Sequence, residues 1–296
     1  MKILITGANG FLGQHLTVYL ANQQWEVIAT GRGDCRIPGT AGFTWLPLDL
    51  TDAEAIESVL QQVQPEVIIH NAAMSKPDEC NRDKAECTRQ NIDATRLLLQ
   101  AAKAFSPHFI YVSTDFVFGE NGPHSEDTIP APLNFYGESK LQAEQLVKQS
   151  GLSYSIMRPV FIYGPIWEQM KPTFLHWVKN NLEQGKPIRV VNDQQRTPTY
   201  VYDICKGLET MILQRSIGDY HLAGKDILSP YQMAIILAHE LGLDASLIER
   251  VNSDTFPEPV QRAKRSGLRI DKAIAELGYH PVSFEQGVRL SFGSQL

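Results

Sequence analysis

The chain has 296 residues, of which 20% are charged, and its formal net charge is -6. An acidic net charge argues against nucleic acid as a partner, and no apolar run approaches the ~20 residues of a membrane-spanning helix. The four cysteines show no Cys-x-x-Cys spacing, so we expect reduced thiols, no disulfide framework and no metal site.

The first predicted element is an apolar strand at residues 2–6, and a glycine turn with the sequence Gly7-Ala8-Asn9-Gly10-Phe11-Leu12-Gly13 follows it directly. An apolar periodic segment then predicts a helix. Glycines allow the backbone to approach a pyrophosphate, whose charge the helix N-terminus receives. The turn therefore predicts a dinucleotide site. Because strand sequence begins at residue 2, we also expect no leader peptide and a cytoplasmic protein.

Strands and helices then alternate along the chain. Strand-like runs occur at 26–30, 66–70, 109–113 and 153–158, and helical patterns occur at 53–63, 89–104 and 136–149. This alternation predicts an α/β fold of the Rossmann type, with a doubly wound parallel sheet. Ligands of such sheets bind at the carboxyl ends of the strands, where the glycine turn, residues 70–73 and Ser113-Thr114 all fall.

The end of the second strand bears on the choice of cofactor. An acidic residue there bonds the ribose hydroxyl of NAD, whereas an arginine accommodates the 2′-phosphate of NADP. The chain reads Thr30-Gly31-Arg32-Gly33-Asp34, so Arg32 favours NADPH. Asp34 lies close enough to keep NADH possible.

Tyr136 and Lys140 lie four residues apart, so a helix places both side chains on one face. A phenol has an ordinary pKa of roughly 10, and an ammonium group beside it lowers that pKa towards the working range. Thr114, at the end of the neighbouring strand, is placed to hold a carbonyl oxygen against Tyr136. These three residues are the predicted catalytic group. The spacing alone leaves a chance pair on an amphipathic helix as the alternative.

The organisation changes after residue 159, where Gly-Pro and Lys-Pro pairs punctuate shorter elements. We predict a dinucleotide-binding domain at 1–163 with a return segment at 198–222. A smaller, partly interleaved substrate-binding lobe takes 164–197 and 223–296. The return segment is expected to contain a helix at 200–213 and a strand at 218–222. The lobe is expected to contain a strand at 188–191 and helices at 230–241 and 268–277, the last ending at Gly278.

Together these motifs resemble the extended short-chain dehydrogenase/reductase superfamily over nearly the whole chain. The resemblance implies that Asn71-Ala72-Ala73 lies along the dinucleotide and that Asp49-Leu50 contacts adenine. It also implies that Asn91 kinks or hydrates its helix, although a helix N-cap is an equally good interpretation. The residues predicted to bind the dinucleotide are Gly7, Asn9, Gly10, Phe11, Leu12, Gly13, Arg32, Asp49, Leu50, Asn71, Ala72, Ala73, Ser113, Tyr136 and Lys140.

Within the superfamily, residues 113–118, 126–140 and 193–199 are similar to the dTDP-4-dehydrorhamnose reductase family. That resemblance implies substrate contacts from Asp115, Phe116, Arg196 and Arg265. Arg196 and Arg265 depart from the family pattern and add two positive charges near the predicted sugar pocket. Residues 71–78 and 195–199 also resemble the methionine adenosyltransferase β subunit, which serves as a regulatory partner. The cations considered for the sugar nucleotide are Arg158, Arg189, Arg196, Lys264, Arg265 and Arg269.

The resemblance implies an NADPH-dependent reductase of a 4-keto deoxysugar nucleotide, in which Tyr136 delivers the proton and Lys140 lowers its pKa and holds the nicotinamide ribose. A sugar-nucleotide epimerase or dehydratase is one alternative, and a non-catalytic nucleotide-binding regulatory subunit is another. The expected partner is a small nucleotide-sugar substrate, with no nucleic acid and no membrane, and a homodimer is possible.

Overall fold

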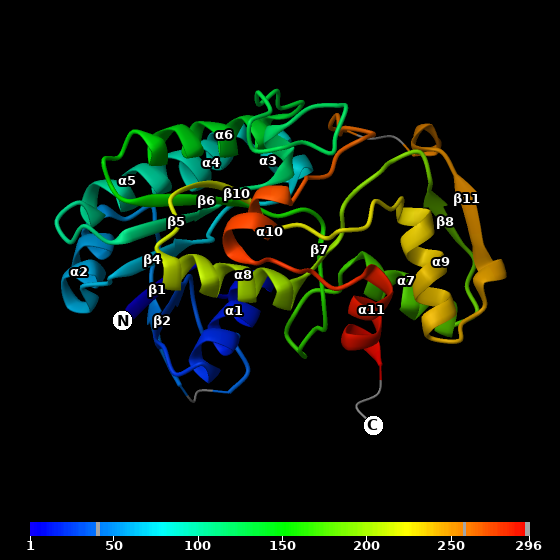
Figure 1. Cartoon of the computed structure of the whole chain (residues 1–296), viewed down its shortest axis with the longest axis horizontal. Helices are drawn as coiled ribbons and strands as arrows, with labels where there is room; N and C mark the ends of the chain where they lie inside the picture. Colours follow the sequence, from blue (N-terminus) through cyan, green and yellow to red (C-terminus); the bar gives the residue numbers. More distant parts are fainter. Residues whose placement is uncertain (40–41, 257–258, 294–296) are drawn as a thin grey trace.

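The computed structural model describes residues 1–39, 42–256 and 259–293. Its centre is a seven-stranded parallel sheet in the order β10-β6-β5-β4-β1-β2-β3 (Figure 1). The strands are β1 (Lys2–Thr6), β2 (Glu26–Gly31), β3 (Phe43–Pro47), β4 (Val67–His70), β5 (His108–Val112), β6 (Tyr154–Arg158) and β10 (Gly218–His221). The strand order reverses direction at β1, so the topological switch point lies between β1 and β4.

Helices cover both faces of this sheet (Figure 1). On one face lie α1 (Phe11–Asn22), α8 (Val201–Gln214) and α10 (Asp271–Leu277), and on the other lie α2 (Ala53–Val63), α5 (Ala94–Ala102) and α6 (Phe135–Lys148). Successive strand residues point to opposite faces, so Ile3 and Ile5 pack under α1 and α8 while Leu4 packs under α2 and α5. Burial on both faces explains why the strand sequences are apolar throughout. The predicted Rossmann-type doubly wound sheet is confirmed.

Short elements connect β4 to β5 and β5 to α6. After β4 come α3 (Pro77–Arg82), α4 (Lys84–Thr88) and a π-helical segment, Arg89–Asp93, that runs directly into α5. A 3-10 turn, Asp115–Val117, follows β5. These elements stand over the carboxyl edge of the sheet.

A smaller lobe occupies the right of Figure 1. Its elements are α7 (Phe174–Glu183), β8 (Ile188–Val191), α9 (Pro230–Glu240), β11 (Ile248–Val251) and α11 (Phe284–Phe292), with 3-10 turns at Ala245–Leu247 and Ser253–Thr255. Two short strands, β7 (Ile162–Tyr163) and β9 (Thr199–Tyr200), belong to the segments that lead into the lobe and back from it. β7 pairs with β9 and β8 with β11, both in parallel. Leu175, Leu237 and Val288 belong to a buried cluster separate from those beneath the main sheet.

Most predicted elements are confirmed to within two residues, and 2–6, 53–63 and 188–191 match in full. Two predictions are wrong. The helix predicted at 268–277 begins at Asp271, because the Leu268 amide donates to Thr197 Oγ1 and the Arg269 amide donates to the His124 carbonyl. The helix predicted at 89–104 is π-helical up to Asp93 and ends at Ala102.

The chain returns from the lobe to the main sheet through α8 and β10, and β10 pairs with β6. On this topology and on the separate lobe cluster we propose a division in which 1–163 and 198–222 form one domain and 164–197 and 223–296 form the other, with α10 of the second domain packed on the main sheet of the first. Residues 257–258 and 294–296 of that lobe lie outside the described part of the chain. Among the helices in the described ranges, none has the length and apolarity needed to cross a membrane.

Candidate functional site

The glycine turn joins β1 to α1 at the carboxyl edge of the sheet. Gly7 has φ +65°, a conformation that side chains other than glycine rarely adopt. A Cβ on Gly7 would lie 2.6 Å from the Ala72 Cα, and one on Gly13 would lie 2.4 Å from the Gly7 carbonyl oxygen. Gly13 therefore packs α1 against the turn and does not line the cleft. Gly10, the N-cap residue, presents the N-terminus of α1 to the cleft.

Asn9 ties the loop after β2 to this turn. Its Nδ2 donates to the Asp34 carbonyl (2.9 Å) and its Oδ1 accepts from the Arg36 amide (2.9 Å). Two arginines, Arg32 and Arg36, consequently line the cleft, whereas the described lining does not include Asp34. Arg36 was not among the predicted site residues, although it lies only four residues after Arg32.

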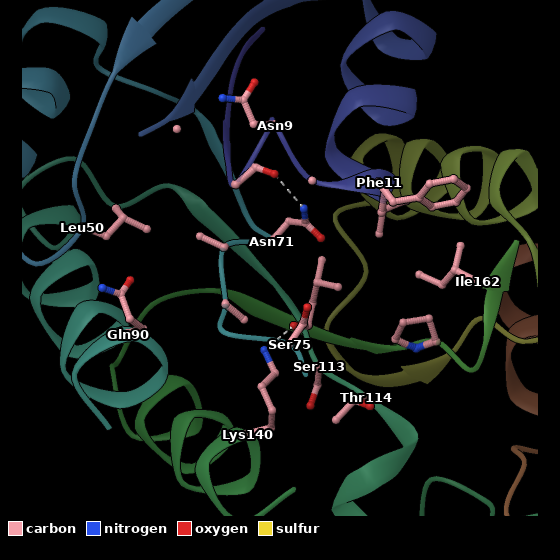
Figure 2. Close-up of a pocket in the computed structure, with 18 of the residues that line it drawn as sticks. Asn9, Phe11, Leu50, Asn71, Ser75, Gln90, Ser113, Thr114, Lys140 and Ile162 are labelled. Atoms are coloured by element: carbon pink, nitrogen blue, oxygen red, sulfur yellow. Dashed lines mark hydrogen bonds between the residues drawn. The ribbon is translucent and has the colours of Figure 1, made fainter. Parts of the chain in front are cut away.

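The loop after β4 closes the other side of the turn. The Asn71 side-chain amide donates to the Gly7 carbonyl (3.2 Å), as Figure 2 shows. Asn91 then fixes the end of the loop, because its Oδ1 accepts from the Met74 amide (2.7 Å) and its Nδ2 donates to the Met74 carbonyl (3.1 Å). Asn91 lies inside the π-helical segment. The N-cap interpretation is therefore wrong, and the π-helical geometry at Asn91 agrees with an irregular helix at this point.

The first turn of α6 approaches the end of β5 very closely. Asn134 starts the helix by accepting from the Gly137 amide (3.0 Å). A Cβ on Gly137 would lie 2.1 Å from the Phe116 carbonyl oxygen, so only glycine permits this approach. As a result Tyr136 lies beside the 115–117 turn, with its ring centre 5.5 Å from that of Phe116.

Tyr136 is 7% exposed, and burial raises the pKa of its phenol, a rise that the neighbouring Thr114 side chain opposes. Lys140 Nζ donates to the Val112 carbonyl (2.8 Å) and lies 4.1 Å from the centre of the Tyr111 ring. Burial lowers the pKa of Lys140 to about 7. The predicted lowering of the Tyr136 pKa by Lys140 is not found. The phenol stays protonated near neutral pH, which is the form that an acid needs.

These elements enclose a cleft of about 670 Å³, within the size range of small-molecule sites. Figure 2 shows Asn71 from the loop after β4, Ser113 and Thr114 from the end of β5, and Lys140 from α6 converging on it. The predicted residues that line it are Gly7, Asn9, Gly10, Phe11, Leu12, Arg32, Asp49, Leu50, Asn71, Ala72, Ala73, Ser113, Thr114, Asp115, Phe116, Tyr136 and Lys140. The Ser113 hydroxyl is buried and makes no hydrogen bond in the described part of the protein.

The predicted substrate cations are not gathered at the cleft. Arg196 lines a small second cavity next to Asp115 and Phe116, where its guanidinium donates to Gln195 O (2.7 Å) and Gln194 Oε1 (3.1 Å). Arg265 has an exposed side chain and lines neither cavity.

Arg158 was also considered for the sugar nucleotide, and this interpretation is wrong. Its guanidinium is 2% exposed and pairs with Glu144 (2.6 Å) and Asp219 (2.8 Å). Lys264 pairs with Asp193 and Arg269 with Asp271, while Arg189 lies over the Phe256 ring.

The lining residues that follow β6 were not among the predicted site residues. Pro159, Phe161 and Ile162 line the cleft, and Phe161 has φ +39°, which is unusual for a bulky side chain. The rule that ligands bind at the carboxyl ends of strands would have found them. The cleft is also lined by Ser75, Gln90 and Thr173, which no sequence pattern marks as ligand-binding residues. Within the described ranges, no three His, Cys, Asp or Glu side chains are grouped to hold a metal ion.

Comparison with known proteins agrees with this geometry. The model of the RmlD substrate binding domain matches residues 1–294. The methionine adenosyltransferase 2 subunit beta of Pongo abelii is 30% identical over 278 residues, which are 92% of this chain and 81% of that protein. The structure of dTDP-4-dehydrorhamnose reductase from Bacillus anthracis in complex with NADP is 26% identical with a TM-score of 0.86, over 98% of both chains.

UDP-glucuronic acid 4-epimerase from Bacillus cereus, in complex with UDP-glucuronic acid and NAD, is 26% identical with a TM-score of 0.85, again over 98% of both chains. These relatives share the fold over nearly the full chain. The family match covers more than nine tenths of the sequence and agrees with the resemblance found in the motifs. The chain belongs to the RmlD substrate-binding-domain family of extended short-chain dehydrogenases/reductases.

Proposed function

We propose that this protein is a nicotinamide-dependent oxidoreductase that uses NADPH to reduce the ketone of a 4-keto deoxysugar nucleotide. The observation that carries the proposal is the convergence of Tyr136, Thr114 and Lys140 on one cleft with a glycine turn at its other end. The similar reductase crystallised with NADP supports the cofactor class, and two arginines at the end of β2 support the phosphorylated form.

The residues of the cleft fit a dinucleotide. Gly7, with φ +65°, and Gly10 line the cleft without side chains, and the helix N-terminus at Gly10 suits a pyrophosphate. Asp49 and Leu50 would hold the adenine end. Arg32 and Arg36 would hold the 2′-phosphate, and the unpartnered Ser113 hydroxyl would take a polar atom at the nicotinamide end.

When bound, the cofactor supplies a hydride to the ketone carbon. The Tyr136 phenol donates its proton to the ketone oxygen, which the Thr114 hydroxyl helps to orient. A protonated Lys140 would stabilise the phenolate that remains after the transfer, because opposite charges nearby favour the ionised form; in the resting site burial raises the pKa of the Tyr136 phenol. Lys140 also reaches the strand end through Val112, close to where a ribose would lie.

The test is the loss of NADPH absorbance with a panel of nucleotide-linked 4-keto sugars, measured for wild type and Tyr136→Phe. We expect kcat to fall on the order of 10²-fold or more without the phenol, the scale of general acid catalysis. Equal activity in the two proteins would contradict the role of Tyr136.

A regulatory subunit is the second candidate, because a methionine adenosyltransferase β subunit is 30% identical to this chain. NADPH binding does not separate the candidates, since a binding-only protein would retain the cleft. Absence of turnover with every keto sugar, together with purification from its host in a complex with a larger enzyme, would establish the regulatory candidate. Interconversion of 4-epimers with no net NADPH loss would instead identify an epimerase.

A further inference from the structure

His70 ends β4 as a fully buried imidazole that the chemistry above does not use. Its Nδ1 lies 2.7 Å from Thr6 Oγ1, at the end of the neighbouring β1, and its Nε2 lies 3.0 Å from Thr95 Oγ1 in α5. The faces and edges of the ring meet the Phe109 and Tyr111 rings of β5. A charged imidazole buried among these neutral groups would cost far more free energy than a neutral one. The ring is therefore neutral, and one nitrogen donates while the other accepts.

Counting protons fixes which nitrogen of His70 donates. The Thr95 hydroxyl has one proton, and it donates that proton to the Asn91 carbonyl (2.7 Å), which can only accept. The Thr95 oxygen must then accept from His70, so the imidazole proton lies on Nε2. Nδ1 is left as an acceptor for the Thr6 hydroxyl, whose oxygen accepts from the Ala72 amide (3.3 Å). These bonds form one chain with a single direction, from the Ala72 amide to the Asn91 carbonyl.

One end of this chain lies at the loop after β4, where Ala72 and Ala73 line the cleft. The same loop touches the glycine turn, since a Cβ on Gly7 would lie 2.6 Å from the Ala72 Cα. The Thr6 hydroxyl holds the Ala72 amide at this point of contact. His70 holds the hydroxyl in turn, so it fixes the loop against the turn.

The other end of the chain lies at the helix that holds α6. Asn91, in the π-helical segment, donates from Nδ2 to Ser139 Oγ (2.9 Å), and Ser139 Oγ donates to the Tyr136 carbonyl (2.7 Å). The Thr95 hydroxyl supplies the Asn91 carbonyl with a side-chain donor. The bond from His70 to Thr95 therefore anchors to the sheet the segment that grips the Tyr136 turn of α6.

We propose that His70 is a positioning residue that acts on both ends of the cleft. Through Thr6 it places the loop expected to lie along the dinucleotide, and through Thr95 and Asn91 it places the helix that carries Tyr136. The inference rests on the proposed reductase function. His70 transfers no proton. It supplies one donor and one acceptor in fixed directions, which only the neutral Nε2-protonated ring provides here.

The first test reads the proton position with neither cofactor nor substrate present. Long-range ¹H–¹⁵N correlation spectra of the ¹⁵N-labelled full chain at neutral pH distinguish the two neutral tautomers, and the signals lost in His70→Gln identify His70. We expect a protonated Nε2 and an unprotonated Nδ1. Thr6→Val should shift the Nδ1 signal more than the Nε2 signal, because it removes the donor to Nδ1. A proton on Nδ1, or a charged ring, overturns the proposal.

The second test separates the two ends of the chain with Thr6→Val and Thr95→Val, which remove a hydroxyl and keep the shape of the side chain. Thr6→Val should raise the Kd for NADPH about 5-fold, more than it lowers kcat. Thr95→Val should lower kcat about 5-fold, more than it raises that Kd. Equal effects on Kd and kcat in both variants would indicate general loosening of the fold and overturn the proposal, as would no effect.

Matched controls come from two other threonines. Thr44→Val changes an exposed strand position, and Thr210→Val removes the same kind of bond to the carbonyl four residues earlier, in α8. Neither should change Kd or kcat. A change in Thr210→Val equal to that in Thr95→Val would show that the bond within the helix, and not His70, is responsible, and would overturn the proposal.

Substitutions of His70 itself provide the rescue experiment. His70→Leu should show both defects. His70→Gln offers an amide donor near the Nε2 position and should recover kcat more than Kd, whereas His70→Asn offers an oxygen near the Nδ1 position and should recover Kd more than kcat. Identical behaviour of the two amides contradicts the proposal. If wild type reduces no keto sugar, the reductase function fails, and the tautomer together with the Kd for NADPH in Thr6→Val decides the role of His70.

Discussion

At the scale of single residues, the site depends on groups whose charge is set by burial. Tyr136 is kept protonated, while Lys140 is held at 2% exposure, where its ammonium donates to the Val112 carbonyl and lies over the Tyr111 ring. Burying an ammonium group costs free energy that its neighbours only partly offset. The proposed catalytic role of Lys140 is therefore kept at a cost to the stability of the folded protein.

Lys140→Met should abolish turnover and raise the melting temperature. The folded pKa of Lys140, about 7, lies below the ordinary 10.5, so the unfolded chain binds more protons between those values and the burial cost is largest below about pH 7. The gain in melting temperature should thus be greater at about pH 6 than at about pH 9.5. Calorimetry at the two pH values checks this, and an equal or larger gain at the higher value would contradict it.

Arg32 and Arg36 test cofactor choice at the same scale. Replacing either by alanine should weaken NADPH binding about 10-fold, the value of one charged hydrogen bond, and leave NADH binding nearly unchanged. Fluorescence titration gives both Kd values. Arg82→Ala, at an exposed position outside the cleft, is the control. Equal losses for the two cofactors would remove the assignment of these arginines to the 2′-phosphate.

At the scale of elements, the catalytic pair depends on how closely α6 approaches the turn after β5. The Asn134 cap fixes where the helix begins, and Gly137 fixes how near it lies to Phe116. Neither residue touches the Tyr136 phenol in the described contacts. Both determine its distance from Thr114.

Gly137→Ala should therefore reduce kcat strongly, although alanine is the better helix former. The added methyl would sit 2.1 Å from the Phe116 carbonyl, and relief of that clash moves α6 away at a cost of about 1–3 kcal/mol in stability. Turnover and urea unfolding measure the two effects. Glu138→Ala, exposed on the same helical turn, should change neither, and a fully active Gly137→Ala would show that the close approach is unnecessary.

At the scale of the whole molecule, neutral buried histidines join its parts. His15 contacts the Pro165 carbonyl, His70 links Thr6 to Thr95, and His221 contacts the Arg269 carbonyl. Burial is the largest cause that lowers their pKa values, to about 4 for His15 and about 3 for His70 and His221. All three must be neutral in the folded protein.

The free energy of unfolding should consequently fall as the pH drops below about 6.5. Between that value and the lowered folded pKa values the unfolded chain binds more protons, so acid favours unfolding. Urea titrations at about pH 7 and about pH 5 measure the slope. His221→Gln should reduce it and His239→Gln, at an exposed position, should not. A flat profile would contradict the neutral state of these histidines.

A feature of the structure could be predicted from the sequence when the interactions that form it join residues close together in the chain. The glycine turn, the strand ends and the Tyr136–Lys140 spacing are local patterns, and they predicted the fold and most of the cleft. The start of α10 depended on backbone bonds from Leu268 and Arg269 to distant segments, which no local periodicity reports. Arg158 looked like a free cation in sequence because its partners, Glu144 and Asp219, come from α6 and β10.

Because β10 pairs with β6, the main sheet can be completed only late in the synthesis of the chain. The last strand of the main sheet is made only after residues 164–197 of the lobe have been added. Until then β6 is an open sheet edge, and Arg158 has only one of its two carboxylate partners. The Ser266 hydroxyl, which donates to Asp115 Oδ2, is synthesised later still. A ribosome-bound chain therefore contains the glycine turn and Tyr136 well before it can complete either the sheet or the surroundings of Asp115.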